Sequence, residues 1–237
     1  MQRRRRKARA GNHARVERGV RLARGRCAQG VLRGFAGEPA VTDAVLSIDF
    51  GGTQTRAAVV TRTGELLSRV STDTQRQEGP EAVIARMKQT AHRALEQSIG
   101  RNVLAVGLSA PGPINPYSGV IYTAPNMPGW KDIPIGQIVA DEFGVPCYAG
   151  NDANLAAMGE WRFGAGRGCH DLVYLTISTG IGSGIISRDR LILGKEGLAS
   201  EAGHMVMEPN GPPCGCGSYG HLEALAAGTS IARIMAW

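Results

Sequence analysis

The sequence of 237 residues lacks any apolar run close to the roughly 20 residues that a membrane-spanning helix needs. It also has few cysteines, five in all, and an odd number favours a reducing compartment over a disulfide framework. We therefore expect a soluble, cytoplasmic protein with no membrane partner. Hydrophobic residues make up 43% of the chain, which is enough for one large or two modest domains.

Acidic side chains are scarce in the first 40 residues, which hold two glutamates against 11 arginines and one lysine. Residues 1–40 thus carry a charge of +10, whereas residues 41–237 carry −3. Such a composition predicts disorder. The segment could be a nucleic-acid-binding arm, a serine-poor transit peptide, or an extension that the natural protein lacks because translation starts at Val41. The abrupt change in composition at Val41 favours the third interpretation, so no nucleic-acid partner is expected.

Candidate ligand residues are densest between residues 201 and 223, in a glycine- and proline-rich stretch that predicts a loop. Two cysteines one residue apart close a mutual disulfide only with strain, whereas they can share a metal ion without it. Two imidazoles and two thiolates select tetrahedral zinc and leave no position open for a catalytic water. Free thiols and surface histidines are the alternative. The predicted ligands of a structural zinc are His204, Cys214, Cys216 and His221.

Glu201 and Glu223 each lie within three residues of a proposed ligand, so the metal would fix both carboxylates for binding a polar molecule. The stretch resembles the signature of the ROK family (repressors, open reading frames, kinases), a Glu-x-Gly-His followed by a Cys-x-Cys-Gly-x-x-Gly-Cys-x-Glu loop. His221 stands where the family usually has a third cysteine. Because histidine is an equally good zinc ligand, we expect the metal to be retained.

A glycine-rich turn, Gly51-Gly52-Thr53, separates the first two of three predicted strands that begin at Ala44. Since the turn joins two strands and opens no helix, it predicts neither a dinucleotide fold nor a P-loop. Its glycines would let backbone N–H groups approach a phosphate, and Asp49 is placed to hold Mg²⁺ through water. A plain hairpin would use the same residues. The segment DFGGTQTR resembles the first phosphate motif of sugar kinases in the actin-like ATPase superfamily.

The middle of the chain alternates helices and strands, which predicts a mixed sheet covered by helices. The helices are expected at residues 80–100, after Asp132 and at residues 153–164. The turn at Asp49, the loop at Ser109 and the pair Asn151-Asp152 all follow strands, so we expect them at one edge of the sheet. Asn151 and Asp152 could equally be ordinary helix caps.

The resemblance to the family assigns roles to these polar residues. NDANLAAMGE is similar to the family segment whose aspartate, here Asp152, takes the proton of a sugar hydroxyl during phosphoryl transfer. APNMPGW resembles a loop on the sugar side of the family's site. The sugar-binding residues implied by the resemblance are Asn126, Asn151, Glu201, His204 and Glu223.

Residues 172–194 repeat the opening pattern of strand, glycine-rich turn, strand, short turn and strand, which predicts a second copy of the fold. The turn at residues 178–184 would face the first turn and help it hold a nucleotide's phosphates, although a hairpin without a ligand is the alternative. One helix is expected from His221 to Trp237. We expect a C-terminally incomplete second lobe with an unpaired sheet edge and an uncovered apolar face.

These patterns predict an α/β, ribonuclease-H-like (actin-like ATPase) fold of two lobes with the second truncated: residues 1–40 form a basic extension, 41–170 the first lobe, and 171–237 the start of the second. The resemblance implies a glucokinase-like enzyme that uses ATP, Mg²⁺ and structural Zn²⁺, binds a sugar and a nucleotide, and forms a homodimer when complete. The alternatives are a sugar-responsive repressor, for which residues 1–40 are too short to fold as a winged helix-turn-helix, and an inactive fragment that binds sugar and zinc. The implied phosphate- or metal-holding residues are Asp49, Gly51, Gly52, Thr53, Thr179, Gly180 and Gly182.

Overall fold

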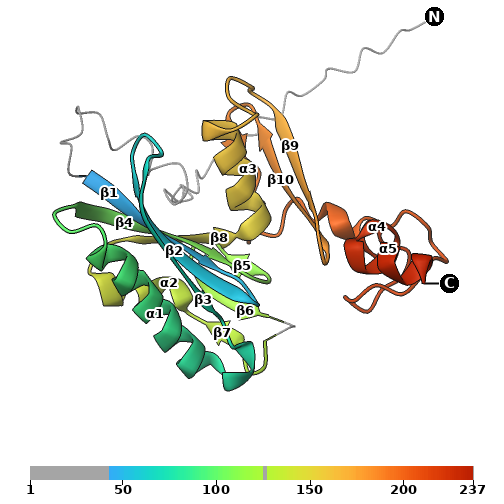
Figure 1. The fold of residues 1–237 in the computed structure, drawn as a ribbon. Coiled ribbons are helices and arrows are strands. Elements are labelled where there is room, and N and C mark those ends of the chain that lie inside the picture. Colours follow the sequence, from blue (N-terminus) through green and yellow to red (C-terminus); the bar gives the residue numbers. More distant parts are fainter. Residues whose placement is uncertain (1–42, 125–126, 237) are drawn as a thin grey trace, which may run out of the picture.

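The computed structural model describes residues 43–124 and 127–236, so the basic segment 1–40 lies outside the described residues. Its largest layer is a five-stranded sheet with α1 and α2 on one face (Figure 1). The strand order is β3-β2-β1-β4-β8. The strands are β1 (Asp43–Phe50), β2 (Gln54–Thr61), β3 (Leu66–Asp73), β4 (Asn102–Ala110) and β8 (Cys147–Asn151). In the described part of the chain, no helix is long and apolar enough to cross a membrane.

The first three strands form the meander that the sequence predicts. In β1 every second residue is buried, from Ala44 through Leu46 and Ile48 to Phe50, because successive side chains of a strand point to opposite faces. This apolar row packs in the same core as the buried stripe of α1 (Pro80–Glu96), which includes Met87. Burial of alternate residues therefore fixes which face of the sheet the helix covers.

The register of the parallel strands confirms that the predicted polar residues share one sheet edge. Asp49 of β1 lies opposite Ser109 of β4, and Ala110 of β4 lies opposite Asn151 of β8. Since β1, β4 and β8 run in the same direction, their carboxyl ends meet there. Asp152 directly follows β8, as the first residue of α3 (Asp152–Phe163).

The middle of the chain differs from the prediction in the end of the first helix and in one additional small sheet. The first helix ends at Glu96 and not at Gly100, and Ile99, which the apolar spacing places on the buried stripe, is 89% exposed. The second helix, α2 (Ile135–Phe143), follows Asp132 as predicted, buries Ile135 and Val139, and ends at its C-cap, Gly144. A small sheet that the sequence reasoning missed precedes it, formed by β5 (Ile114–Asn115), β6 (Val120–Thr123) and β7 (Lys131–Ile133).

A second three-stranded sheet follows in the order β11-β10-β9. Its strands are β9 (Leu172–Ile177), β10 (Ile181–Ser187) and β11 (Arg190–Leu191), so the predicted repeat of the hairpin is present with a very short third strand. On β9, Val173, Leu175 and Ile177 are each at least 50% exposed and share one face. This is the uncovered apolar face expected from the sequence, and β9 is an edge strand of its sheet.

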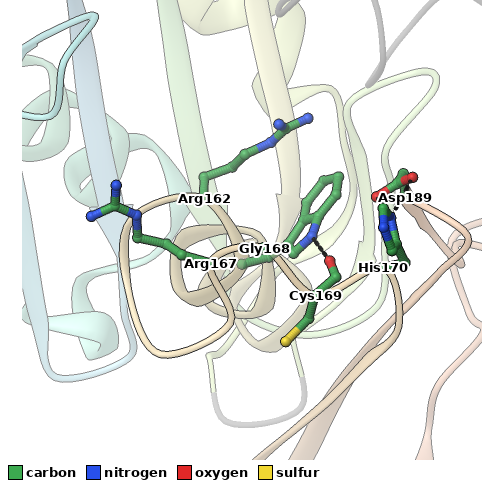
Figure 2. Close-up of a pocket in the computed structure, with 7 residues that line it drawn as sticks. Arg162, Arg167, Gly168, Cys169, His170 and Asp189 are labelled. Atoms are coloured by element: carbon green, nitrogen blue, oxygen red, sulfur yellow. Dashed lines mark hydrogen bonds and ion pairs between the residues drawn. The ribbon is translucent and has the colours of Figure 1, made fainter.

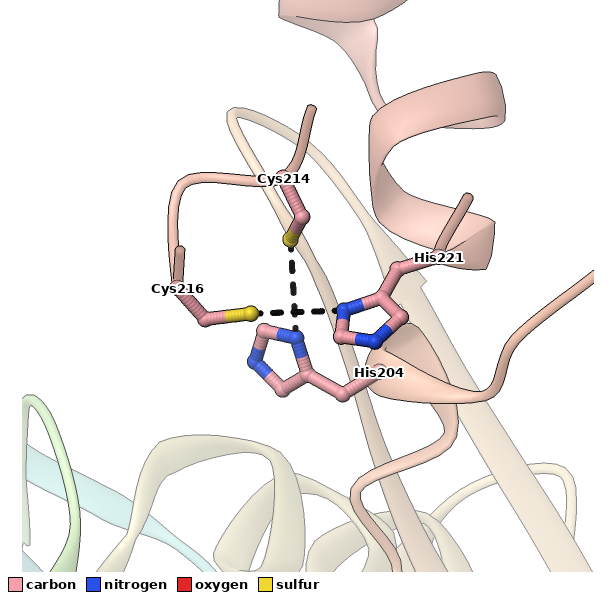
Figure 3. A group of neighbouring side chains, drawn as sticks. All are labelled: His204, Cys214, Cys216 and His221. Atoms are coloured by element: carbon pink, nitrogen blue, oxygen red, sulfur yellow. Dashed lines mark hydrogen bonds between the residues drawn. The ribbon is translucent and has the colours of Figure 1, made fainter. Parts of the chain in front are cut away.

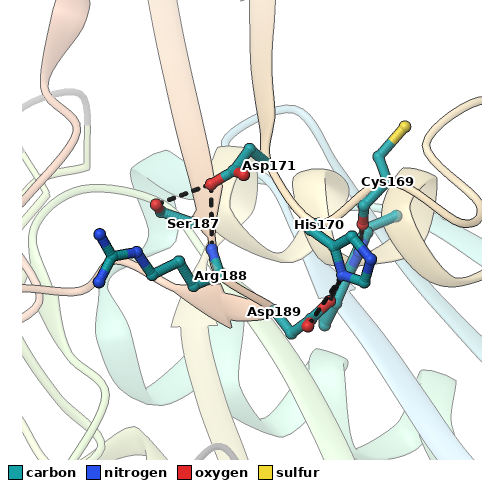
Figure 4. Close-up of polar contacts among 7 residues, drawn as sticks. Cys169, His170, Asp171, Ser187, Arg188 and Asp189 are labelled. Carbon is teal, nitrogen blue, oxygen red and sulfur yellow. Dashed lines mark hydrogen bonds and ion pairs between the residues drawn. The ribbon is translucent and has the colours of Figure 1, made fainter.

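Polar contacts close the end of the second sheet that lies near the β10–β11 turn (Figure 4). Asp171 accepts hydrogen bonds from the hydroxyl of Ser187 at 2.8 Å and the backbone N–H of Arg188 at 3.0 Å. His170 Nδ1 lies 2.9 Å from Asp189 Oδ1, and this contact raises the pKa of the imidazole. The start of β9 is thereby tied to the turn at the far end of β10.

The chain ends in a compact loop region and two short helices in place of the single helix predicted after His221. This region contains the 3₁₀ turn η2 (Ala202–His204), α4 (Leu222–Ala226) and α5 (Gly228–Met235), and a further 3₁₀ turn, η1 (Arg76–Glu78), precedes α1. Ala227 breaks the helix because its backbone is extended, with φ −69° and ψ 157°. The break lets the N–H of Gly228 bond the carbonyl of Ser178 at 2.8 Å, which anchors α5 on the β9–β10 turn.

Helix α3 contacts strands of both larger sheets and packs against β10 through two glycines. A Cβ added to Gly182 would lie 3.0 Å from Cβ of Ala153, and one added to Gly184 would lie 2.5 Å from Cβ of Ala157. Any larger residue at Gly184 would therefore force the helix away from the strand.

We expect Gly184→Ala to lower the free energy of unfolding by about 1–3 kcal/mol, because the added methyl group overlaps α3. Urea denaturation measures the change. Gly159→Ala in the same helix is the matched control, since no atom lies within 4 Å of its Cβ position. That variant should be neutral or slightly more stable. Equal stability of the two variants would contradict the close packing of α3 on β10.

Candidate active site

In the first glycine turn, the carbonyls of Gly51 and Thr53 accept hydrogen bonds, whereas the N–H groups of Gly52 and Thr53 have no partner in the described part of the chain. Thr74, which is buried, donates its hydroxyl proton to the carbonyl of Gly51 at 2.7 Å and its N–H to the carbonyl of Thr53 at 2.8 Å. Among the described residues, no hydrogen bond uses the backbone N–H of Gly52 or Thr53. Two adjacent N–H groups without a partner are available as donors to an anion.

A small network holds Thr74 in place. Its hydroxyl accepts a hydrogen bond from the buried hydroxyl of Thr55 at 3.0 Å, because its own proton is given to Gly51. Arg86 of α1 donates to the carbonyl of Thr74 at 2.8 Å. The loop between β3 and α1 is thus fixed to the turn through buried polar contacts, which are costly to leave unmade.

Asp49 lies on β1 beside the turn, as expected, and forms an ion pair with Arg56 at 2.9 Å. Both side chains are more than 40% exposed, so the pair is in contact with solvent and contributes little to stability. The sequence reasoning missed Arg56. Its position opposite Asp49 in the β1–β2 register would have indicated the pairing, since directly opposed residues on one face interact.

The second turn, residues 178–180, repeats this arrangement with different partners. The carbonyl of Ser178 accepts the N–H of Gly228, and the carbonyl of Thr179 accepts the hydroxyl of Thr229, both at 2.8 Å. No hydrogen bond among the described residues uses the N–H of Thr179 or Gly180. The second turn therefore also presents two free donors. It is shorter than the predicted seven residues, because Gly182 lies inside β10, where packing against α3 accounts for it.

Asn151 caps helix α3, and Asp152 occupies the first position of that helix. The Asn151 Oδ1 atom accepts the N–H groups of Ala153 and Asn154 at 3.0 and 3.3 Å. Asp152 uses Oδ1 to accept the N–H of Ala153 at 2.8 Å, which leaves Oδ2 without a partner among the described residues. The side chain of Asp152 is exposed, so Oδ2 is accessible to a ligand.

The loop that follows the second sheet brings two more carboxylates and an imidazole toward Asp152. Partial burial raises the pKa of Glu201, His204 opposes that rise, and the negative charges of Asp152 and Glu223 add to it. These interactions mean that groups from α3, η2 and α4 share one electrostatic environment. A cluster of carboxylates at a sheet edge is suited to binding the hydroxyl groups of a polar molecule.

Glu223 also joins this cluster to the second turn. Its Oε2 accepts the N–H of Ile181 at 2.8 Å, while its Oε1 lies 4.0 Å from the sulfur of Cys214. A Cβ at Gly180 would collide with the same carboxylate, so glycine is required there for Glu223 to reach the strand. The family resemblance implies a sugar-binding role for Glu223, and nothing in the sequence indicates this contact. Asn126, the remaining predicted sugar ligand, lies outside the described residues.

The four predicted zinc ligands converge on one point (Figure 3). The ligand atoms of His204, Cys214, Cys216 and His221 all lie within 4.8 Å of one another. The sulfur of Cys214 is 3.7 Å from Nδ1 of His204, and that of Cys216 is 3.3 Å from Nδ1 of His221. A tetrahedral zinc with ordinary bond lengths requires sulfur–nitrogen separations of roughly 3.5 Å. The side chains therefore fit the metal that the sequence predicts.

A separate hollow lies at the opposite end of α3 from Asp152 (Figure 2), with a volume of about 230 Å³. Arg162 stacks on the ring of Trp161 at 4.0 Å, and the Trp161 indole donates to the carbonyl of Cys169 at 2.7 Å. Figure 2 shows the guanidinium groups of Arg162 and Arg167 pointing away from each other. Without converging donors, this hollow lacks the organisation of the candidate active site.

Two glycine turns with free N–H groups, set beside a carboxylate cluster on a duplicated strand pattern, define a protein of the actin-like ATPase fold class. The chain belongs to the ROK family, whose model matches residues 45–236.

Three relatives illustrate the match. A glucokinase of Thermotoga maritima is 40% identical over 191 residues, which cover 81% of this chain and 59% of the relative. A ROK hexokinase structure from Thermus thermophilus is 42% identical with a TM-score of 0.73, covering 81% of this chain and 63% of that one. A ROK glucokinase from Streptomyces griseus, in complex with glucose and AMPPNP, is 37% identical with a TM-score of 0.70, covering 80% and 59%. The chain thus spans about three-fifths of the length of these relatives.

We expect Thr74→Val to lower the free energy of unfolding by about 1–3 kcal/mol, because the buried Thr55 hydroxyl and Gly51 carbonyl each lose a partner. Thr63→Val removes a hydroxyl from an exposed contact with Thr61 and should change stability by less than about 0.5 kcal/mol. Thermal unfolding of both variants measures the difference. A loss no larger than that of Thr63→Val would show that Thr74 does not hold the turn.

Proposed function

We propose that this protein transfers the γ-phosphoryl group of ATP to a hydroxyl of a hexose, as a glucokinase does. The electrostatic grouping of Asp152, which follows β8, with Glu201, His204 and Glu223 carries the proposal. The Thermotoga maritima glucokinase and the Streptomyces griseus structure with glucose and AMPPNP support a hexose and a nucleotide as the ligands. A coupled assay with glucose and ATP tests it, and an absence of both turnover and glucose binding would contradict it.

Asp152 is proposed as the general base. Its Oδ1 is held by the N–H of Ala153, so the free Oδ2 can accept the proton of the attacking sugar hydroxyl as the bond to phosphorus forms. Asn151, Glu201, His204 and Glu223, together with Asn126, would bind the other hydroxyl groups. Asn151 retains its amide N–H₂ for this purpose, because the helix cap uses Oδ1.

The two glycine turns are proposed to hold the donor's phosphates, the first through the N–H groups of Gly52 and Thr53 and the second through those of Thr179 and Gly180. Gly51, whose N–H bonds the carbonyl of Gln54 at 3.0 Å, would only let the backbone approach the phosphate closely. Free N–H groups bind phosphate oxygens without reorganisation during the reaction, which favours the transition state. Mg²⁺, when bound, would neutralise the developing charge on the phosphates. Asp49 is the carboxylate nearest to the first turn in sequence and would hold Mg²⁺ through water, with Arg56 as its present partner.

Zinc is proposed as a structural ion held by His204, Cys214, Cys216 and His221. Four protein ligands would close its coordination shell, so the ion would stabilise the loop and supply no catalytic water. Burial raises the pKa of the Cys214 thiol, and a bound cation would oppose that rise by favouring the thiolate. His204 would bind the ion through Nδ1 and present Nε2 to the sugar.

In this proposal residues 41–170 form the first lobe and residues 171–237 belong to the second, with the sugar between them. A cytoplasmic location and a homodimer of the complete protein are further parts of the proposal.

We expect Asp152→Asn to lower kcat by about 10²- to 10⁴-fold with sugar binding nearly unchanged, because the asparagine keeps the shape but cannot accept the proton. Asp141→Asn is the control, because it changes an exposed aspartate of α2 that contacts Gln137 and is not part of the candidate site. It should leave kcat unaltered. Steady-state kinetics and glucose titration separate the two effects. A loss of sugar affinity at constant kcat would assign Asp152 to binding.

We expect freshly purified protein to contain one equivalent of zinc, and Cys216→Ser to lose both the metal and much of its glucose affinity. Elemental analysis and calorimetric titration measure these quantities. Cys169→Ser is the matched control, because Cys169 is also an exposed free cysteine but lies outside the ligand group. Metal-free wild-type protein, or full zinc content in Cys216→Ser, would contradict the assignment.

A further inference from the structure

A cavity of about 540 Å³ lies beside the first glycine turn. One wall is the turn itself, at Gly52 and Thr53, and the other is the loop that carries η1. The lining residues are Gly52, Thr53, Asp73, Gln75, Arg76, Gln77 and Glu78. The free N–H groups of Gly52 and Thr53 therefore belong to residues that border this cavity, so an anion bound to the turn would extend into it.

Arg76 places a positive charge next to the turn. Its Nη1 atom lies 3.8 Å from the position that a Cβ on Gly52 would occupy. Arg76 is exposed, and within residues 43–124 and 127–236 no hydrogen bond or ion pair joins its guanidinium to another group. An arginine with all its donors available can bind two oxygens of a phosphate at once.

The buried threonine network positions this arginine. Thr74, two residues before Arg76, is bonded to the carbonyls of Gly51 and Thr53, and Arg86 grips both the carbonyl of Thr74 and the carboxylate of Glu78. Gln75, between Thr74 and Arg76, has φ 52°, a left-handed conformation that is uncommon for a residue other than glycine. The chain is thereby held beside the turn on both sides of Arg76.

The charge balance of the cavity depends on two carboxylates. Glu78 is paired with Arg86, so its charge is neutralised within the wall. Asp73 is the other acidic group of the lining and has no ion pair in the described part of the chain. A donor that arrives with bound Mg²⁺ carries both signs of charge and can satisfy Arg76 with phosphate and Asp73 with a water of the metal.

We propose that Arg76 is a second, side-chain ligand for the phosphoanhydride chain of the donor, on the phosphates beyond the one nearest the ribose. This inference rests on the proposed phosphoryl transfer and deepens it by naming a residue that neither the family resemblance nor the sequence pattern identifies. Nucleoside triphosphate and inorganic polyphosphate share this chemistry. The guanidinium would bind the phosphoanhydride chain beside the N–H groups of the first turn.

Binding of ATP, AMP and tripolyphosphate, each with Mg²⁺ present, to the full chain by calorimetry tests the proposal. We expect Arg76→Gln to weaken ATP binding roughly 10- to 100-fold, the range for charge-assisted hydrogen bonds, and to leave AMP binding unchanged. Arg76→Lys should recover only part of the affinity, because lysine lacks the bidentate fork. Arg69→Gln removes the same charge from an exposed site on β3 and should match wild type.

The outcomes distinguish failure of the proposed Arg76 contact from failure of the proposed phosphoryl transfer. A loss confined to ATP assigns the subsite to the nucleotide, and an equal loss for tripolyphosphate assigns it to any phosphoanhydride chain. Equal ATP affinity of Arg76→Gln and Arg69→Gln, or an equal loss for AMP, overturns the proposal for Arg76 while the proposed function stands. Wild-type protein that binds neither ATP nor glucose overturns the proposed function itself. Thermal unfolding of Arg76→Gln and Arg69→Gln is the control that checks whether both variants are folded.

Discussion

Hydrogen bonds that occupy the backbone carbonyls of the two glycine turns determine what the rest of the site can do. A peptide group offers one donor and one acceptor, and a turn attracts anions only where its acceptors are directed elsewhere. In the first turn the acceptors bond to Thr74, and in the second they bond to Gly228 and Thr229. The same electrostatic result is reached in both halves of the repeat with unrelated partners.

The segments next to each turn supply the donors that bond its carbonyls. The loop between β3 and α1 carries Thr74 to the first turn, and the break at Ala227 directs the N-terminus of α5 to the second. Glu223 adds a link between the second turn and the metal-ligand loop through its bond to the N–H of Ile181. Ordering of that loop by a metal would therefore reach both the carboxylates proposed to bind the sugar and the strand that follows the second turn.

The errors in local prediction have identifiable physical causes. Ile99 continues the helical spacing of α1, but the helix has already ended at Glu96, so the periodicity persists beyond the structure it normally indicates. The segment after His221 is interrupted by Gly228, Thr229 and Ser230, which have low helix propensity, and the hydrogen bond from Gly228 to Ser178 fixes the break between α4 and α5. For Gly182, a phosphate role stays a prediction: the residue lies in β10 against Ala153, and glycine serves both turns and close packing, which the sequence does not distinguish.

The sequence by itself determined the α/β class, the repeated hairpin, the shared sheet edge of Asp49, Ser109 and Asn151, and the four residues whose ligand atoms converge as a candidate metal site. These follow from strand periodicity, from the direction of parallel strands and from the chemistry of the ligand types, all of which are local or topological. The tertiary structure alone decided the pairing of Asp49 with Arg56, the role of Thr74, the contact of Glu223 with Ile181 and the position of Arg76. Each of these joins side chains to backbone groups across a turn or between elements, and such contacts depend on how elements pack, which no local pattern encodes.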